Sequence, residues 1–184
     1  MQVQLDLYNS GKHPGNDADT IQTIKMVTEQ NERLSKMVKT LLDMSELQTV
    51  GRDETIIVNA LVDEVLADLE PLAQEKNIKL IGKCKDVNMV GSDILIYRLV
   101  YNLVENAIKY NHSGGQVSVE AYQREKQVYL SVKDTGNGIP EELKERVFEP
   151  FFRVDKSRSR ELGGVGLGLA LVNEIVRVHD GSIA

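Results

Sequence analysis

The sequence predicts an α+β fold, a two-layer sandwich in which a mixed β-sheet packs on helices, preceded by one long helix. Strand-like and helix-like segments follow one another without strict alternation, and this order favours a helix layer on a mixed sheet. Two runs, 117–121 and 128–132, alternate apolar and polar residues and predict neighbouring antiparallel strands. Residues 20–48 contain neither Gly nor Pro, and they predict the long helix.

The apolar residues of the 20–48 helix recur at spacings of three and four, which is the pattern of a coiled-coil seam. A single helix cannot bury such a seam. The pattern therefore predicts self-association or, alternatively, packing of the helix on the C-terminal part of its own chain. Asn31 is a polar member of the seam and is suited to set its register. The seam consists of Ile24, Val27, Asn31, Leu34, Val38, Leu41 and Ser45.

Further elements are expected along residues 51–184. A strand at 55–58 precedes a helix that runs from a cap at Asn59 to about Lys76, and Pro71 should bend or interrupt this helix. Ser92 is expected to cap a helix over 93–110. The remaining expected elements are strands at 78–81 and 87–90, a short helix after Pro140, a helix from the glycine-rich stretch 163–168 to about His179, and the start of a strand at 182–184.

Composition argues against several classes of protein. The 22 Lys and Arg residues against 28 Asp and Glu give a net charge of −6, so we expect no nucleic-acid partner, because phosphate binding needs a basic surface. Cys84 is the only cysteine, so no internal disulfide forms. No apolar run approaches the roughly 20 residues that span a bilayer, and no signal peptide is recognisable. We therefore expect a cytoplasmic location and no membrane contact for these residues.

The predicted 93–110 helix carries polar residues on a different line from its apolar stripe. At about 100° per residue, Asn102, Asn106 and Lys109 share one face. Amide oxygens suit Mg²⁺, and a lysine adds positive charge for phosphate. The pattern taken alone favours the simpler alternative, a solvated face with incidental Asn residues.

A second motif, Asp134-Thr-Gly136-Asn-Gly138-Ile139-Pro, comes directly after a predicted strand. Two glycines two residues apart let backbone approach a ligand closely. A carboxylate at a strand end can accept a hydrogen bond from an exocyclic amine. An ordinary turn that contains Asp and Gly is the alternative interpretation.

A third motif, Gly164-Val-Gly166-Leu167-Gly168, opens the last predicted helix. The free backbone N–H groups and the positive end of a helix can bind phosphate. The alternative is a flexible linker, which fits less well because linkers are usually polar and do not run into an amphipathic helix.

All three Phe residues of the chain lie in one predicted loop, 148–152, and Arg153 follows directly. Such aromatics indicate an anchor for the loop, of which the remainder can then move as a lid with basic residues directed at phosphates. A small satellite core beneath a long loop is the alternative, and both interpretations can hold together.

Taken in chain order (93–110, 134–140, 148–153 and 164–168), the four motifs resemble the N, G1, F and G2 boxes of sensor histidine kinases. The resemblance covers about residues 20–184, and the stretch 31–38 resembles the second helix of that family's dimerisation hairpin. It implies the Bergerat ATP-binding fold of the GHKL superfamily, with ATP between helices and a lid. It divides the chain into a partial dimerisation and phosphotransfer domain, residues 1–50, and an ATP-binding catalytic domain, residues 51–184, cut off in its last strand.

The resemblance also implies roles for the motif residues. Asn106 resembles the Mg²⁺ ligand, and Lys109 resembles a lysine that faces the phosphates. Tyr110 resembles an aromatic side chain that lies against adenine. Asp134 resembles a residue that accepts a hydrogen bond from the adenine amino group. Arg153 resembles a lid residue near the phosphates, and it is expected to be catalytic together with Asn106 and Lys109. The expected nucleotide contacts are Asn102, Asn106, Lys109, Tyr110, Asp134, Gly136, Gly138, Ile139, Gly164, Gly166, Leu167 and Gly168.

The implied activity is transfer of the ATP γ-phosphate to a histidine on a dimerisation helix, for relay to an Asp of a response regulator receiver domain. A homodimer through the 20–48 helix and a membrane-anchored parent protein are also implied. The sequence departs from the family at the phosphoacceptor, because His13 lies in a glycine-rich turn and both His112 and His179 lie within 51–184. We therefore expect the chain to bind ATP but not to phosphorylate itself.

Two other functions are compatible with the sequence. The chain is alternatively a nucleotide-binding dimerisation module without kinase activity, which the lack of a suitable histidine favours. The third interpretation is a gyrase-type ATPase relative, in which a glutamate replaces the first Asn of the helix motif. Asn102 and the preceding heptad helix argue against it, and ATP turnover that depends on Glu105 would favour it.

Overall fold

The computed structural model of the chain describes residues 17–154 and 165–184. The chain divides into two compact units, Met1–Lys39 and Thr40–Ala184. The first unit contributes most of α2 (Asp17–Glu46). This helix is the long helix that the sequence predicted over 20–48. The apolar seam of this helix is exposed, as Ile24 shows with 60% of its surface accessible. The fold therefore leaves a hydrophobic helix face that a partner helix can cover.

The last turns of α2 belong to the larger unit, which they join through an ion pair and a buried leucine. Asp43 Oδ1 lies 2.8 Å from Arg98 Nη1 on α4, and both side chains are largely shielded from solvent. Leu47, directly after the helix, is buried in the hydrophobic core. The functional boundary expected near residue 50 stays a prediction.

The strands of the larger unit form a two-stranded and a three-stranded sheet. β1 (Glu54–Ile57) pairs antiparallel with β3 (Asn88–Gly91). In the second sheet, β4 (Gln116–Arg124) lies between β2 (Lys79–Gly82), to which it is parallel, and β5 (Gln127–Asp134), to which it is antiparallel. The predicted antiparallel pair is thus confirmed, and the sheet is mixed.

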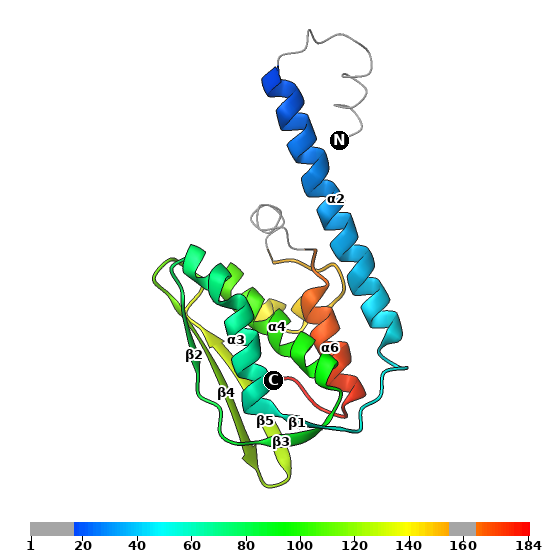
Figure 1. Ribbon diagram of the computed structural model, residues 1–184, viewed down its shortest axis with the longest axis vertical. Helices are drawn as coiled ribbons and strands as arrows, with labels where there is room; N and C mark the ends of the chain where they lie inside the picture. Colours follow the sequence, from blue (N-terminus) through cyan, green and yellow to red (C-terminus); the bar gives the residue numbers. More distant parts are fainter. Residues whose placement is uncertain (1–16, 155–164) are drawn as a thin grey trace. The chain divides into compact units, whose positions relative to one another are not determined.

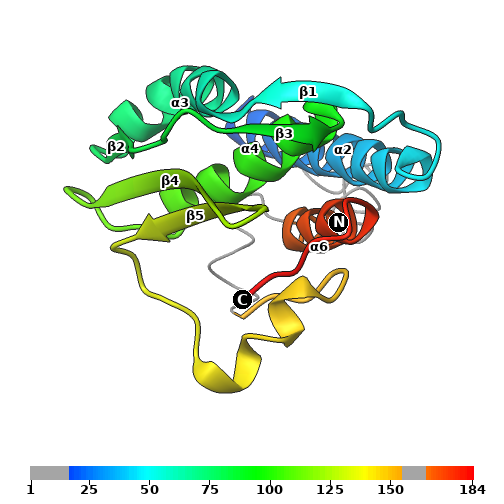
Figure 2. The ribbon, with the colours of Figure 1, turned by 90° about the horizontal axis from the view of Figure 1, so that it is seen from below.

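Three helices lie on one side of the strands and form the second layer (Figures 1 and 2). They are α3 (Val58–Glu75), α4 (Asp93–Lys109) and α6 (Gly168–Val178), and α4 packs against both of the others. Their apolar sides and the inner face of β4 form the core. The predicted fold class is confirmed. Among the helices of residues 17–154 and 165–184, none has the length and apolar character needed to cross a membrane.

Two helices end in the same way, at an Asn or Asp in the left-handed region. After α3, Asn77 has φ 55°, and the Ile78 N–H donates to the Ala73 carbonyl at 2.8 Å. After α6, Asp180 has φ 53°, and the Gly181 N–H donates to the Val176 carbonyl at 2.9 Å. This is the hydrogen-bond pattern of a Schellman cap, which Asn and Asp tolerate better than other side chains.

Four local expectations differ from the structure. Asn59 is not a cap, because α3 already begins at Val58. Pro71 lies inside α3 without ending it, since the burial of Leu69 and Ala73 on either side outweighs the lost hydrogen bond. Residues 182–184 form no strand.

Ser92 is the fourth difference, because it occupies the cap position of α4 but makes no side-chain cap bond. Its backbone N–H instead donates to His179 Nε2 at 3.1 Å. His179 Nδ1 lies 2.8 Å from the Ile175 carbonyl. The imidazole therefore joins the start of α4 to the end of α6, a structural role that accounts for a histidine at this position.

Candidate functional site

The first part of the candidate site is the crossing of α4 and the start of α6. The Asn102 amide nitrogen donates to the Arg98 carbonyl at 2.7 Å, which directs its oxygen away from that turn. A Cβ atom placed on Gly168 would lie 2.9 Å from Asn102 Oδ1 and 3.8 Å from Asn106 Nδ2. A side chain at this position would displace the Asn102 amide. Three predicted residues are thus brought together.

The start of α6 gives this crossing the character of an anion site. Leu167 is the cap residue of the helix and, having no polar side chain, makes no side-chain bond to the first turn. The N–H groups of the first turn of a helix carry partial positive charge and bind anions. The Asn102 amide oxygen and the Asn106 amide nitrogen face this turn, and an amide side chain can offer its oxygen to a hard cation. The arrangement can bind a phosphate group together with Mg²⁺.

Lys109 lies one turn further along α4 and is already engaged by a carboxylate. Its Nζ lies 2.7 Å from Glu105 Oε1, and the two side chains are only 16% and 15% exposed. The Lys109 backbone carbonyl accepts a hydrogen bond from Lys76 Nζ at 3.0 Å. Glu105 therefore fixes where the Lys109 ammonium lies, and the sequence did not single out this pairing.

Tyr110 ends α4, and its side chain is 40% exposed. Partial burial raises the pKa of its hydroxyl above the ordinary value of 10; the positive charge of Arg153 opposes this shift, and Glu105 adds to it. The ring therefore carries a neutral hydroxyl at neutral pH. The mutual influence of the charges also indicates that Arg153 lies near the C-terminal end of α4.

Asp134 lies at the end of β5, where its side chain caps the turn that follows. Its Oδ1 accepts the Gly136 N–H at 2.7 Å, an Asx turn. A Cβ atom on Gly136 would lie 2.7 Å from the Tyr110 carbonyl oxygen. The turn thus requires glycine in order to lie against the end of α4. One carboxylate oxygen serves the turn, and the other can accept a hydrogen bond from a ligand.

This turn is held in place by Asn111, Thr135 and the Gln116 backbone. None of these three residues was indicated by the sequence. Thr135 Oγ1 donates to Asn111 Oδ1 at 3.1 Å and accepts the Gln116 N–H at 3.0 Å. Asn111 Nδ2 donates to the Gln116 carbonyl at 3.1 Å. The network links the loop after α4 to the start of β4 and the end of β5. The only sign of this network in the sequence is that polar residues, Asn111 and Thr135, lie close to the ends of the two predicted strands.

The next glycine of the motif, Gly138, has φ 67°, a conformation that favours glycine. Ile139 follows it and is 44% exposed. The chain then forms two short 3₁₀ helices, η1 (Glu141–Leu143) and η2 (Arg146–Phe148), where the sequence predicted a short helix after Pro140. Figure 2 shows this segment running from the end of β5 towards α6.

The phenylalanine-rich loop lies against the glycines that precede α6. The Phe151 N–H donates to the Gly166 carbonyl at 2.7 Å, and a Cβ on Gly166 would lie 2.7 Å from the Phe152 carbonyl oxygen. Phe151 has φ 65° and is more than half exposed, whereas the Phe152 ring lies 4.4 Å beneath the Arg146 guanidinium. The aromatics thus anchor the loop only in part, because Phe151 does not pack inside. Gly164 lies outside the described residues.

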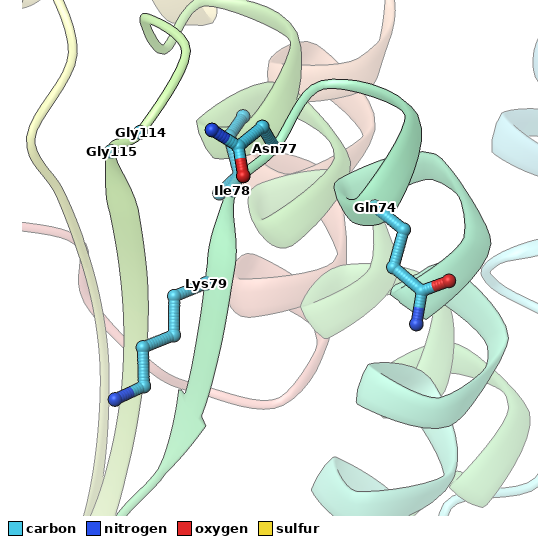
Figure 3. A pocket seen from close by; sticks show the side chains of 6 residues that line it. All are labelled: Gln74, Asn77, Ile78, Lys79, Gly114 and Gly115. Atoms are coloured by element: carbon cyan, nitrogen blue, oxygen red, sulfur yellow. The ribbon is translucent and has the colours of Figure 1, made fainter.

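The site borders an open hollow of about 330 Å³, shown in Figure 3, to which none of the predicted residues contributes. A Cβ on Gly115, at the edge of this hollow, would lie 2.3 Å from Asn111 Oδ1 and 2.7 Å from Thr135 Oγ1. The hollow thus lies behind the network that supports the Asp134 turn. It is lined by Gln74, Asn77, Ile78, Lys79, Gly114 and Gly115.

Comparison with known proteins agrees with this geometry. Residues 91–184, which contain all four motifs, match the family described as histidine kinase-, DNA gyrase B- and HSP90-like ATPase. The chain belongs to this family. Within the family it is a catalytic domain of the histidine kinase type, because its similar proteins are sensor histidine kinases. The resemblance stated from the four motifs is therefore confirmed.

Two similar proteins, one of them in two solved structures, illustrate the relationship. The sensor-like histidine kinase SenX3 of Mycolicibacterium smegmatis is 37% identical over 173 residues, which are 91% of this chain and 45% of SenX3. The nucleotide-free catalytic domain of histidine kinase ThkA is 29% identical, with a TM-score of 0.61 over 69% of this chain and 81% of that one. ThkA in complex with response regulator protein TrrA gives 27% identity and a TM-score of 0.67 over 87% and 49%. The chain spans less than half the length of the first curated relatives it matches.

Proposed function

We propose that the chain is the ATP-binding catalytic part of a two-component sensor histidine kinase, which transfers the ATP γ-phosphate to a histidine on a dimerisation helix. The main support is the approach of the start of α6 to Asn102 and Asn106 at Gly168. That crossing combines a helix N-terminus with two asparagine side chains, a set that fits a phosphate chain and its metal ion.

At the phosphate end, Asn106 is the proposed Mg²⁺ ligand, with Asn102 beside it. Mg²⁺, when bound with ATP, neutralises part of the phosphate charge. Lys109 supplies a second positive charge from the same helix face. Because Glu105 already holds the Lys109 ammonium at 2.7 Å, this charge is positioned before nucleotide arrives.

At the base end, Asp134 accepts a hydrogen bond from the adenine amino group through the carboxylate oxygen that its turn does not use. Gly136, Gly138 and Ile139 bring backbone and an exposed apolar side chain to the adenine. The neutral Tyr110 ring supplies an aromatic face. The Asx turn supports this role, since it fixes the carboxylate through the 2.7 Å bond from Gly136.

Arg153, Gly164, Gly166 and Leu167 belong to the proposed lid. The support is the backbone bond from Phe151 to Gly166, which brings the stretch before Arg153 next to the start of α6. A lid that begins and ends beside the phosphate-binding helix excludes water when it closes. Arg153 then adds positive charge near the transferred phosphate.

The partners belong to the same proposal. The exposed seam of α2 pairs with a second copy, which makes residues 1–50 part of a dimerisation domain and leaves 51–184 as the catalytic domain. The phosphorylated histidine then passes its phosphate to an Asp of a response regulator receiver domain. We also propose that the reaction takes place in the cytoplasm, where ATP is available.

Calorimetric titration with ATP, with and without Mg²⁺, tests the binding part of this proposal. We expect saturable 1:1 binding that needs Mg²⁺ for full affinity and that Asp134→Asn weakens at least about tenfold. The substituted amide still accepts the Gly136 N–H, so the fold is retained. Asp53→Asn, at an exposed carboxylate in the joint before β1, is the matched control and should bind as the unchanged chain does.

The phosphotransfer part needs a histidine supplied in trans. The chain alone should not label itself from ATP, and it should label an added dimerisation hairpin that carries the histidine. If a folded, ATP-binding chain labels no such hairpin, a nucleotide-binding dimerisation module without kinase activity becomes the better interpretation.

A gyrase-type ATPase requires a glutamate that activates water. Glu105 is a carboxylate on the same helix, but its Oε1 is engaged by Lys109 Nζ at 2.7 Å. Steady ATP turnover that disappears in Glu105→Gln would nevertheless favour the ATPase over the kinase.

A further inference from the structure

The face of the β2-β4-β5 sheet that points away from the helices is exposed. Along β4, Val117, Val119 and Ala121 are buried in the core. Successive side chains of a strand alternate between its two faces, so Glu120 and Tyr122 point outward. Figures 1 and 2 show the helix layer on the other side of these strands only.

The ladder between β2 and β4 continues past the end of β2 and brings three lysines onto this outer face. Lys79 pairs with Gln116, and the Lys83 and Lys85 N–H groups donate to the Val119 and Ala121 carbonyls at 2.8 and 2.9 Å. The three lysines are separated by even numbers of residues in one extended segment, so they share its outward face. All three are exposed.

The hairpin of β4 and β5 adds two more cations to the same face. Arg124 pairs with Gln127 near the turn, and Lys133 pairs with Ser118. Glu120 is the carboxylate among these outward positions, and it lies 3.7 Å from Lys133. The chain has a net charge of −6, yet this surface carries five cations against one carboxylate. We define the basic sheet face as Lys79, Lys83, Lys85, Glu120, Tyr122, Arg124, Tyr129 and Lys133.

Two tyrosines form the apolar part of the basic sheet face. Tyr122 and Tyr129 are paired across β4 and β5, with ring centroids 5.2 Å apart and planes 8° from parallel. They are 37% and 41% exposed. Tyrosine and lysine both combine an apolar body with a polar end, which suits a boundary between water and hydrocarbon.

We propose that the basic sheet face docks on an anionic lipid surface. Its cations are spread over three neighbouring strands of one face, as a planar anionic surface requires. Four of the five cations are lysines, a residue type depleted at protein–protein interfaces but effective in attraction to anionic headgroups. The overall negative charge does not prevent this, because salt screens charges beyond about 8–10 Å.

Single-stranded RNA is the main competitor for such a face, because aromatic residues on neighbouring strands can stack on bases. Here, however, the two rings stack on each other, which occupies one face of each. The Tyr129 hydroxyl also donates to Gln127 at 3.1 Å. The stacked pair is therefore poorly suited to receive a base between its rings.

Vesicle sedimentation with the full chain tests the proposal. Vesicles of phosphatidylglycerol mixed with phosphatidylcholine should bind the chain at least about tenfold more strongly than pure phosphatidylcholine, and binding should fall as salt is raised. The triple variant Lys79→Gln/Lys83→Gln/Lys85→Gln should lose roughly 100-fold in partitioning, at about fivefold per cation.

A second triple variant, Lys25→Gln/Lys39→Gln/Lys144→Gln, removes the same charge from exposed positions outside the basic sheet face. It should lose less than about fivefold, and circular dichroism should show that both variants are folded. Equal losses in the two variants would overturn the proposal, as would absence of binding to anionic vesicles. Tighter binding to oligouridylate than to vesicles, lost in the first variant, would assign the face to RNA instead.

Discussion

The two glycine motifs of the candidate site are fixed by different means. The turn after β5 is held by side chains, since Asp134 caps it and Thr135 joins it to Asn111 and the start of β4. The stretch before α6 is held by backbone, through the bond between Phe151 and Gly166 and the close approach at Gly168. The first arrangement fixes a carboxylate, whereas the second leaves helix N–H groups accessible. This difference suits the proposed roles of the first motif in recognising the base and of the second in binding phosphate.

The largest loss of stability is expected at Gly166, where the backbone of the phenylalanine-rich loop leaves no room for a side chain. Gly166→Ala should lower the free energy of unfolding by about 2–4 kcal/mol, because φ is 79° and the new Cβ would lie 2.7 Å from the Phe152 carbonyl oxygen. Gly138→Ala is the control, since φ is 67° but no atom lies within 4 Å, and it should cost about 1–2 kcal/mol. Urea denaturation measures both, and equal losses would contradict the comparison.

Removal of a hydroxyl should weaken the side-chain arrangement next. Thr135→Val leaves the Gln116 N–H and the Asn111 amide without their common partner, and we expect a loss of about 1–2 kcal/mol in the free energy of unfolding. Thr49→Val, which removes one exposed local bond to the Glu46 carbonyl, should cost less than about 0.5 kcal/mol. A Thr135 variant as stable as the Thr49 variant would show that backbone alone holds the turn.

A double-mutant cycle sharpens the role of Gly168. Gly168→Ala should destabilise by about 1 kcal/mol, and Asn102→Ala should relieve part of this loss, because the new methyl group collides with the Asn102 amide. We expect a coupling of about 0.5–1 kcal/mol from chemical denaturation. Asn111→Ala, at the other motif, provides the control cycle and should be additive with Gly168→Ala. Coupling of equal size in both cycles would rule out a direct contact.

The smallest effect concerns Tyr110, which lies between the two motifs. Burial raises the pKa of its hydroxyl above 10, with Arg153 opposing and Glu105 reinforcing the shift. A raised pKa means that the neutral hydroxyl stabilises the fold below pH 10 and that this contribution is lost as pH rises through the folded-state pKa. Tyr110→Phe should therefore lose less stability above pH 10 than the unchanged chain. The free energy of unfolding of both proteins is measured at pH 7 and above pH 10. An equal decrease in the two proteins would contradict this expectation.

The residues proposed to contact a ligand were easier to single out from the sequence than the residues that hold them in place. Helix periodicity places Asn102 and Asn106 on one face, and Asp134 follows a predicted strand, but their proposed roles came from the family resemblance. The bond from Thr135 to Asn111 depends instead on two loops that meet only after the sheet has formed. The sequence argued against His179 as a phosphoacceptor but did not indicate its structural role, which is to bond two backbone groups at the ends of α4 and α6.

The basic sheet face was not foreseen for a related reason. Net charge and apolar runs predicted neither nucleic-acid nor membrane contact, since both are properties of the sequence as a whole. Lys83 and Lys133 are fifty residues apart, and only strand register places them on one surface. Pairing of this kind is decided by tertiary packing, which local periodicity does not encode.

The parallel pairing of β2 with β4 has a consequence for synthesis on the ribosome. β2 is complete at Gly82, but its partner β4 begins only at Gln116, and α4 lies between them in the chain. The three-stranded sheet cannot assemble until those later residues have emerged, because parallel strands need a long crossover. During that interval the nascent chain exposes the apolar sides of α3 and α4, which makes this stage of translation the one at which a chaperone is most useful.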